Sequence, residues 1–344
     1  MKRRTALLLV LLFAAIARPA ASTPTAIFAF GDSLSDVGND LKAFGFPVSP
    51  PYYKGRFSNG PNWVEDLAAG YGLGPMVPSL SGGTDYAFGG ARSGVRGSSI
   101  PLLPDTGDIP TTLEQVRAFA AQKGLDLSHT ALYTVWSGAN DIIAAGVSFS
   151  KKDATLPDLI AGVNQAAAFE VTAIKELIDA GARDIVVVGL PDIGITPLFA
   201  TTEYQTFAPG TNLFVSAISQ QYSVALSKAV AGLPEVRFFD VFSLLGSVQA
   251  NPASYGFANA TLGCYTGDRF GLPPQPVPAP TACSSDLSVQ NSYLFWDMVH
   301  PTQAGHAIFA SLVVPEPASA AVLALALGGL FAARRRRRSE RSRD

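Results

Sequence analysis

The stretch Ala26-Ile27-Phe28-Ala29-Phe30-Gly31-Asp32-Ser33-Leu34 decides the fold of this chain. Five apolar residues in a row, ended by a glycine and two polar residues, are typical of a strand that is buried on both faces. Three further runs have the same character, at 131–136, 184–190 and 236–240. Runs of this kind indicate the strands of a parallel sheet.

Helical patterns separate these runs, at 111–122, 159–180 and 212–231. The first opens with Thr111 and, three residues later, Glu114, which is the pattern of a capping box. Strands that alternate with helices predict an α/β fold with helices on both sides of a parallel sheet. We expect one catalytic domain over 23–313, with its ligand site beyond the carboxyl ends of the strands.

Composition and charge exclude two classes of protein. Of the 344 residues, 48% are hydrophobic, and the mean hydropathy is +0.23, which excludes intrinsic disorder for the body of the chain. The two ends hold 11 of the 25 Lys and Arg residues but 3 of the 27 Asp and Glu residues. The body therefore carries 14 basic and 24 acidic residues, a net charge near −10. An acidic body excludes a nucleic-acid partner, which would require clustered basic residues.

The first 22 residues predict export. Lys2, Arg3 and Arg4 precede an apolar run from 6 to 17, and small residues follow. This order is typical of a secretory signal peptide, because the apolar run is shorter than the ~20 residues of a membrane span. A permanent N-terminal anchor is the alternative.

The chain has two cysteines, Cys264 and Cys283, on either side of a Gly- and Pro-rich stretch. In an oxidising compartment, such a pair predicts a disulfide that closes the loop, worth ~3 kcal/mol in the entropic account. We do not expect a metal site there, since no histidine or second cysteine pair lies nearby.

Polar residues follow each of the first two apolar runs. Ser33, just past the first strand and at the expected start of a helix, has the position of a nucleophile, although an ordinary helix N-cap explains a lone serine as well. Asn140, after the second run, offers an uncharged amide donor for an oxyanion, and capping of the next helix is the alternative. Gly90, in the Gly-rich stretch 82–91, offers a second backbone donor, or is part of a simple turn.

A histidine near the end of the body completes the set. His300 has the residue type of a general base, and Asp297, three residues earlier, could hold its ring if the segment is one turn that folds back. We expect His306 to belong to the following helix and His129 to lie in a solvated turn. Six aromatic residues on the long connections either line an acyl pocket or cover the core: Phe44, Phe46, Tyr52, Tyr53, Phe57 and Trp63.

Four blocks together resemble the GDSL or SGNH hydrolase family: Gly-Asp-Ser-Leu at 31–34, Gly90, Gly-Ala-Asn-Asp at 138–141 and Asp-Met-Val-His at 297–300. They occur in family order over nearly the whole body. The stretch 190–197 is also similar to a loop of the longer GDSL lipases and esterases. The resemblance implies a three-layer, flavodoxin-like α/β/α sandwich with about five parallel strands.

The resemblance also implies the role of each site residue. Ser33 is the nucleophile, His300 the general base and Asp297 the residue that orients it. The oxyanion hole is formed by the N–H groups of Ser33 and Gly90 and the side chain of Asn140. Gly90 is preferred to Gly89 because it lies five residues after Asp85, a position where the family usually has Asn.

The last 31 residues, 314–344, resemble the PEP-CTERM sorting signal of Gram-negative bacteria. Pro315-Glu316-Pro317 precedes an apolar segment at 320–333, and five consecutive arginines follow. The resemblance implies a short transmembrane helix, transient membrane association and processing by an exosortase-type protease. The implied location is the cell surface or the extracellular space. A simple C-terminal membrane anchor is the alternative.

These observations predict a secreted serine ester hydrolase that acts on a lipid or small acyl ester and needs no cofactor. An acyltransferase shares the same acyl-enzyme and is the first alternative. A non-catalytic surface or matrix binding protein on the same fold is the second. A metal-dependent hydrolase is not expected, because the histidines have no ligand spacing such as His-x-x-x-His.

Overall fold

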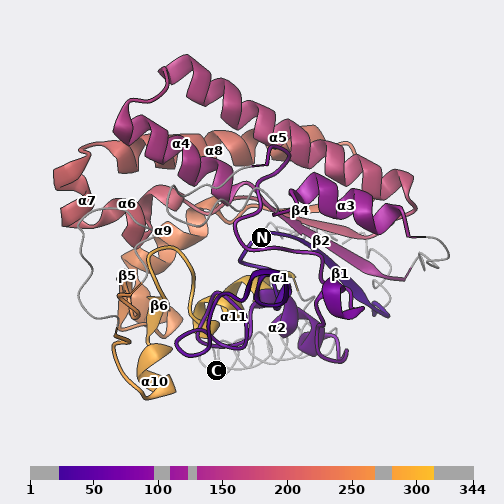
Figure 1. Cartoon of the computed structure of the whole chain (residues 1–344), viewed down its shortest axis with the longest axis horizontal. Coiled ribbons are helices and arrows are strands. Elements are labelled where there is room, and N and C mark those ends of the chain that lie inside the picture. The colour runs from indigo at the N-terminus through magenta and orange to yellow at the C-terminus, as the bar shows by residue number, and fades with distance from the viewer. Residues whose placement is uncertain (1–22, 97–108, 123–129, 268–280, 314–344) are drawn as a thin grey trace, which may run out of the picture.

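The computed structural model describes residues 23–96, 109–122, 130–267 and 281–313 (Figure 1). The predicted signal peptide, the sorting segment, His129 and most of the loop between the two cysteines lie outside the described residues. Figure 1 shows a sheet with helices on both sides, which confirms the predicted α/β class.

The main sheet has four parallel strands in the order β1-β2-β3-β4. A fifth segment lies along the free edge of β1: the N–H of Ala29 donates to the carbonyl of Thr84, and the N–H of Tyr86 donates back to Ala29. This segment follows β1 in the chain and precedes β2. Counted with it, the order is that of the flavodoxin-like fold, 2-1-3-4-5. The fifth position is a single parallel bridge at Asp85 rather than a full strand.

Helices and strands of the described residues have the following bounds: β1 Ile27–Gly31, α1 Asn39–Phe44, α2 Trp63–Gly70, α3 Thr112–Ala120, β2 Leu132–Trp136, α4 Ala139–Lys151, α5 Leu156–Asp179, β3 Ile185–Val188, α6 Pro197–Ala200, α7 Thr202–Phe207, α8 Thr211–Val230, β4 Val236–Phe239, α9 Phe242–Ala250, β5 Asn259–Gly263, α10 Leu287–Gln290, β6 Tyr293–Phe295 and α11 Gln303–Val313. Short 3₁₀ turns stand at 79–81, 193–195 and 252–255. The predicted strands and long helices agree with these bounds to within a few residues, and the predicted capping box of Thr111 and Glu114 begins α3.

Successive side chains of a strand point to opposite faces of the sheet. Both faces are apolar here because consecutive residues of each strand are apolar. In β3, Ile185 and Val187 join the core under α3, α4, α5 and α8, whereas Val186 and Val188 join the core over α2 and α11. The strands therefore read as continuous apolar runs instead of alternating ones. The three-layer arrangement follows directly from this pattern.

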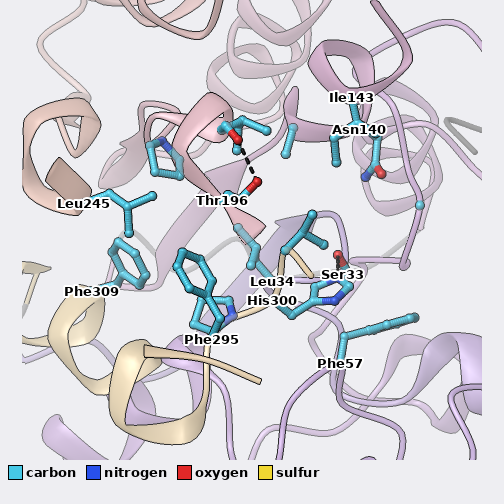
Figure 2. Close-up of a pocket in the computed structure, with 16 residues that line it drawn as sticks. Ser33, Leu34, Phe57, Asn140, Ile143, Thr196, Leu245, Phe295, His300 and Phe309 are labelled. Atoms are coloured by element: carbon cyan, nitrogen blue, oxygen red, sulfur yellow. Dashed lines mark hydrogen bonds between the residues drawn. The ribbon is translucent and has the colours of Figure 1, made fainter. Parts of the chain in front are cut away.

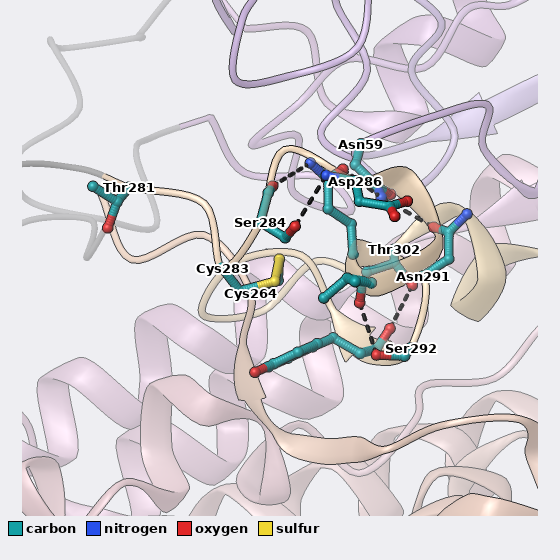
Figure 3. The surroundings of a disulfide bond; sticks show 12 residues. Asn59, Cys264, Thr281, Cys283, Ser284, Asp286, Asn291, Ser292 and Thr302 are labelled. Atoms are coloured by element: carbon teal, nitrogen blue, oxygen red, sulfur yellow. Dashed lines mark hydrogen bonds between the residues drawn. A yellow bond between two sulfur atoms is a disulfide. The ribbon is translucent and has the colours of Figure 1, made fainter.

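A smaller unit completes the chain. Strands β5 and β6 form this unit as a parallel pair. The last helix, α11, packs against α2 on one side of the main sheet. A disulfide joins Cys264 to Cys283 just after β5, with the sulfur atoms 2.02 Å apart (Figure 3). The N–H of Cys283 also donates to the carbonyl of Cys264, at 2.7 Å. This link holds the segment after β5 beside the segment that precedes α10.

Among the described residues, no helix combines the length and the apolar character that crossing a bilayer requires. The segment 320–333, for which a short transmembrane helix was predicted, lies outside them.

Candidate active site

Ser33 lies in a single turn that directly follows β1. The N–H groups of Ser35 and Asp36 both donate to the carbonyl of Asp32, and Leu34 donates to its carboxylate, so the turn is closed around Ser33. We expected Ser33 to begin a helix. This prediction was wrong: the turn ends after one round of hydrogen bonds, and α1 begins only at Asn39.

The glycine before this turn is required by close packing. Gly31 has φ +146°, and a Cβ atom there would lie 2.0 Å from the carbonyl oxygen of Trp136 on β2. A larger residue would have to push β1 away from β2. The close approach also brings the carboxyl ends of these two strands together, and residues of the site follow each of them: Ser33 after β1 and Asn140 after β2.

His300 and Asp297 lie against Ser33 in the order expected for proton transfer. The Nε2 atom of His300 is 2.8 Å from the Oγ atom of Ser33, and its Nδ1 atom is 2.7 Å from Oδ2 of Asp297. Oδ1 of Asp297 accepts the backbone N–H groups of Val299 and His300, at 2.9 and 2.8 Å. The segment is therefore one turn that folds back on itself.

Electrostatics fix the protonation of this group. Burial opposes ionisation of the Asp297 carboxyl, but the charge of His300 and hydrogen bonds from His300 and Val299 outweigh it, and its pKa lies below the ordinary value. An ionised carboxylate only accepts hydrogen bonds, so Nδ1 of His300 carries the proton. Nε2 is then the unprotonated nitrogen, and it faces the hydroxyl of Ser33.

Gly90 and Asn140 line the same pocket as Ser33 and His300. Asn140 is the second residue of α4, and its amide donates to the carbonyl of Ala91 at 3.0 Å, which fixes the amide beside Gly90. Gly90 has φ +74°, a conformation that favours glycine. The N–H of Gly89 donates instead to Asp36, at 3.1 Å. The geometry therefore favours Gly90 over its neighbour as a donor toward the pocket.

At Asp85, where the resemblance implies Asn, the side chain is hydrogen-bonded within this part of the chain. Its carboxylate accepts the N–H groups of Val37 at 2.8 Å and Ala87 at 3.2 Å, so both oxygens have donors. Burial and the neighbouring charge of Asp36 raise the pKa of Asp85 well above its ordinary value. The stretch that leads to Gly90 is thus tied to the turn after β1.

The pocket beside Ser33 is apolar over most of its wall. Figure 2 shows Ser33, His300 and Asn140 near one end and Leu245, Phe295 and Phe309 at the other, with Thr196 between. The remaining apolar wall is formed by Leu34, Phe57, Ala139, Ile143, Pro191, Ile193, Val299 and Pro301. A space with reactive groups at one end and hydrocarbon along its length suits an apolar acyl group.

The sequence analysis named the polar residues that the structure brings together in this pocket, Ser33, Asn140 and His300, but missed most of its apolar wall. Of the six aromatic residues singled out, only Phe57 lines the pocket, while Trp63 is fully buried beside the sheet and Tyr52 contacts Asp297. Leu245, Phe295 and Phe309 carry no sequence signal, because they look like any other core residue. The loop at 190–197 does contribute, through Pro191, Ile193 and Thr196.

His306 lies in α11, as predicted, and is buried close to His300. Burial first, and then the charge of His300, lower the pKa of His306 to about 3, so it stays neutral. Within the described part of the chain, no group of three or more His, Cys, Asp or Glu residues could hold a metal ion.

The chain is similar to ester-processing proteins over nearly its whole body. The model of the family described as "GDSL-like Lipase/Acylhydrolase" matches residues 27–313. A phosphatidylcholine-sterol acyltransferase of Aeromonas hydrophila is 28% identical over 327 residues, which cover 86% of this chain and 89% of the relative. Two GDSL esterase/lipase proteins of Arabidopsis thaliana are 28% and 27% identical, over 84% of this chain and 85% and 89% of their own lengths.

Proposed function

This chain belongs to the GDSL-like lipase/acylhydrolase family, and we propose that it hydrolyses carboxylic esters through an acyl-enzyme on Ser33. The observation that carries the proposal is the continuous chain of short contacts from Ser33 through His300 to Asp297, of 2.8 and 2.7 Å. A nucleophile, a base and a group that orients the base are the three parts of this chemistry. They come from segments 267 residues apart in the sequence.

In the proposed reaction, the hydroxyl of Ser33 attacks the ester carbonyl while Nε2 of His300 accepts its proton. Asp297 holds the imidazole and stabilises the imidazolium that forms. The negative oxygen is stabilised by the N–H groups of Ser33 and Gly90 and the amide of Asn140. His300 returns the proton to the departing alcohol, and a water molecule, activated by the same base, then releases the acid from Ser33.

We propose that the acyl group of the substrate is apolar, because eleven of the residues that line the pocket are apolar or aromatic side chains and Thr196 turns its hydroxyl to the carbonyl of Ile193. p-Nitrophenyl esters of increasing acyl length test this directly. We expect kcat/KM to rise from acetate to medium chains. The Ser33→Ala variant is the control for uncatalysed and non-specific hydrolysis. A steady fall with acyl length would contradict an apolar acyl site.

Acyl transfer is the second candidate, favoured by the similarity to the phosphatidylcholine-sterol acyltransferase. Both reactions share the acyl-enzyme and differ in whether water or an alcohol attacks it. Product analysis with an added acceptor alcohol separates them. An acylated alcohol as the main product would support transfer, whereas free acid alone would support hydrolysis.

We propose that residues 1–22 are a signal peptide, that 23–313 form the hydrolase domain and that 314–344 are a sorting segment removed by an exosortase-type protease of a Gram-negative host. The basic and apolar patterns of both ends support this proposal, as does the disulfide, which suits an exported protein. The mass of the mature protein is the test. A surface protein that still contains the five arginines would contradict processing.

A further inference from the structure

The carboxylate of Asp297 has a partner that sequence reasoning did not find. The hydroxyl of Tyr52 donates to Oδ2 of Asp297 at 2.8 Å, although the two residues are 245 positions apart. Oδ2 is the same oxygen that accepts Nδ1 of His300. Oδ1 already accepts two backbone N–H groups. Tyr52 therefore shares with His300 the one oxygen that faces the base.

Tyr52 is held firmly in this position. Its side chain is 6% exposed, and its ring packs edge-on against Tyr265, Phe57 and Trp296, with centroids 5.7, 6.2 and 6.5 Å away. Cys264, one end of the disulfide, belongs to the same buried cluster as Tyr52 and Trp296. A ring with this packing presents its hydroxyl to Asp297 in a fixed direction.

Building on the proposed hydrolysis, we propose that Tyr52 is a positioning residue for His300 and acts through Asp297. A hydrogen bond to a carboxylate oxygen withdraws negative charge from it, and a charged acceptor makes the bond strong. The hydroxyl of Tyr52 thus limits how strongly Oδ2 attracts the proton on His300. It also takes a second acceptor position of Oδ2, which restricts the movement of the carboxylate to which Nδ1 is hydrogen-bonded.

Removal of the hydroxyl has a defined consequence. Without this hydrogen bond, Oδ2 carries more negative charge and stabilises the imidazolium form of His300 more strongly. The base therefore remains protonated up to a higher pH. Asp297, already considered, and two other titratable groups face His300. Burial raises the pKa of Asp32 to about 7, although hydrogen bonding and the charge of His300 oppose the rise. When Asp32 is ionised, the negative charge of its carboxylate also favours protonated His300. His306 stays neutral.

The experiment is the pH profile of kcat/KM for the Tyr52→Phe variant, measured with a p-nitrophenyl ester between pH 5 and pH 9. We expect the midpoint of the acid limb to rise by about 0.5 to 1 pH unit, with KM unchanged. Tyr133→Phe is the matched control. Its hydroxyl is also buried and has no acceptor among the described residues, so we expect a wild-type profile. Asp32→Asn, which removes a negative charge near His300, should move the midpoint down.

A second variant keeps the fold and strengthens the donor. 3-Fluorotyrosine at position 52 has a more acidic hydroxyl, and we expect it to lower the midpoint, opposite to Tyr52→Phe. If Tyr52→Phe does not fold, this protein decides the question. Midpoints of both proteins equal to that of the wild type would overturn the role of Tyr52. Absence of ester hydrolysis by the wild type would instead refute the proposed function and leave the two failures distinct.

Discussion

The fold contains a buried carboxyl whose ionisation should control stability. Glu170 on α5 is fully buried; the hydroxyl of Tyr222 on α8 donates to its Oε2, and its Oε1 has no hydrogen-bond partner within the described residues. Burial raises the pKa of Glu170 from the ordinary 4.5 to about 8. The hydrogen bond from Tyr222 opposes this rise, and the charges of Asp32 and Asp141 add to it. The folded state therefore favours the protonated form.

The sign and size of the effect follow from linkage. Because the folded pKa is the higher one, stability decreases as the pH rises from the unfolded to the folded value. Between pH 6 and pH 9, this one group should remove about 2–3 kcal/mol of the free energy of unfolding. Glu170→Gln keeps an acceptor for Tyr222 but cannot ionise. We expect the variant to be more stable than the wild type already at pH 6, and this advantage to grow by about 2–3 kcal/mol by pH 9.

Urea unfolding of both proteins at pH 6 and pH 9 measures this difference. Glu235→Gln, on the half-buried turn before β4, is the matched control, and we expect it to keep the pH dependence of the wild type. The reasoning is refuted if Glu170→Gln loses as much stability as the wild type between the two pH values. Lower stability than the wild type at pH 9 would also contradict it.

The remaining predictions concern the site and the disulfide. Asn140→Ala should lower kcat by about 10²–10³-fold with little change in KM, because one oxyanion donor is lost. Steady-state kinetics on a p-nitrophenyl ester measure this change. An unchanged kcat would show that Asn140 is not part of the site. Gly90→Ala should lower both kcat and the melting temperature, because φ is +74° there and the new Cβ would lie 3.1 Å from Ile109. A variant with the kcat and the melting temperature of the wild type would contradict this prediction. Replacing Cys264 and Cys283 by Ala should reduce the free energy of unfolding by about 3 kcal/mol in urea, and no loss would contradict a structural role for the bond.

The layers of the fold could be predicted from the sequence because each strand is apolar on both faces. Val186 and Val187 point to opposite cores of the protein. A continuous apolar run therefore indicates a strand that is buried between two layers of helices. The fifth position of the sheet could not be predicted. It consists of one bridge at Asp85, in a Gly-rich stretch where close backbone contacts replace apolar side chains.

The candidate site was predictable in its reactive parts and not in its surroundings. Ser33, Asn140 and His300 stand in short polar stretches that directly follow or precede apolar ones, and such stretches are visible in a single sequence. Tyr52 and Phe309 are different, because an aromatic residue has the same sequence signature in a core, in a pocket wall or beside a carboxylate. Only the three-dimensional packing of distant segments assigns these roles.

The most direct test of the account is covalent labelling of the proposed nucleophile. The wild-type protein is treated with a fluorophosphonate at neutral pH, and the modified peptide is identified by mass spectrometry. We expect a single adduct on Ser33, and much slower labelling of His300→Ala, because the base 2.8 Å from the Ser33 hydroxyl is then missing. An adduct on another serine, or equal labelling rates for the two proteins, would contradict the proposal that Ser33 and His300 act together.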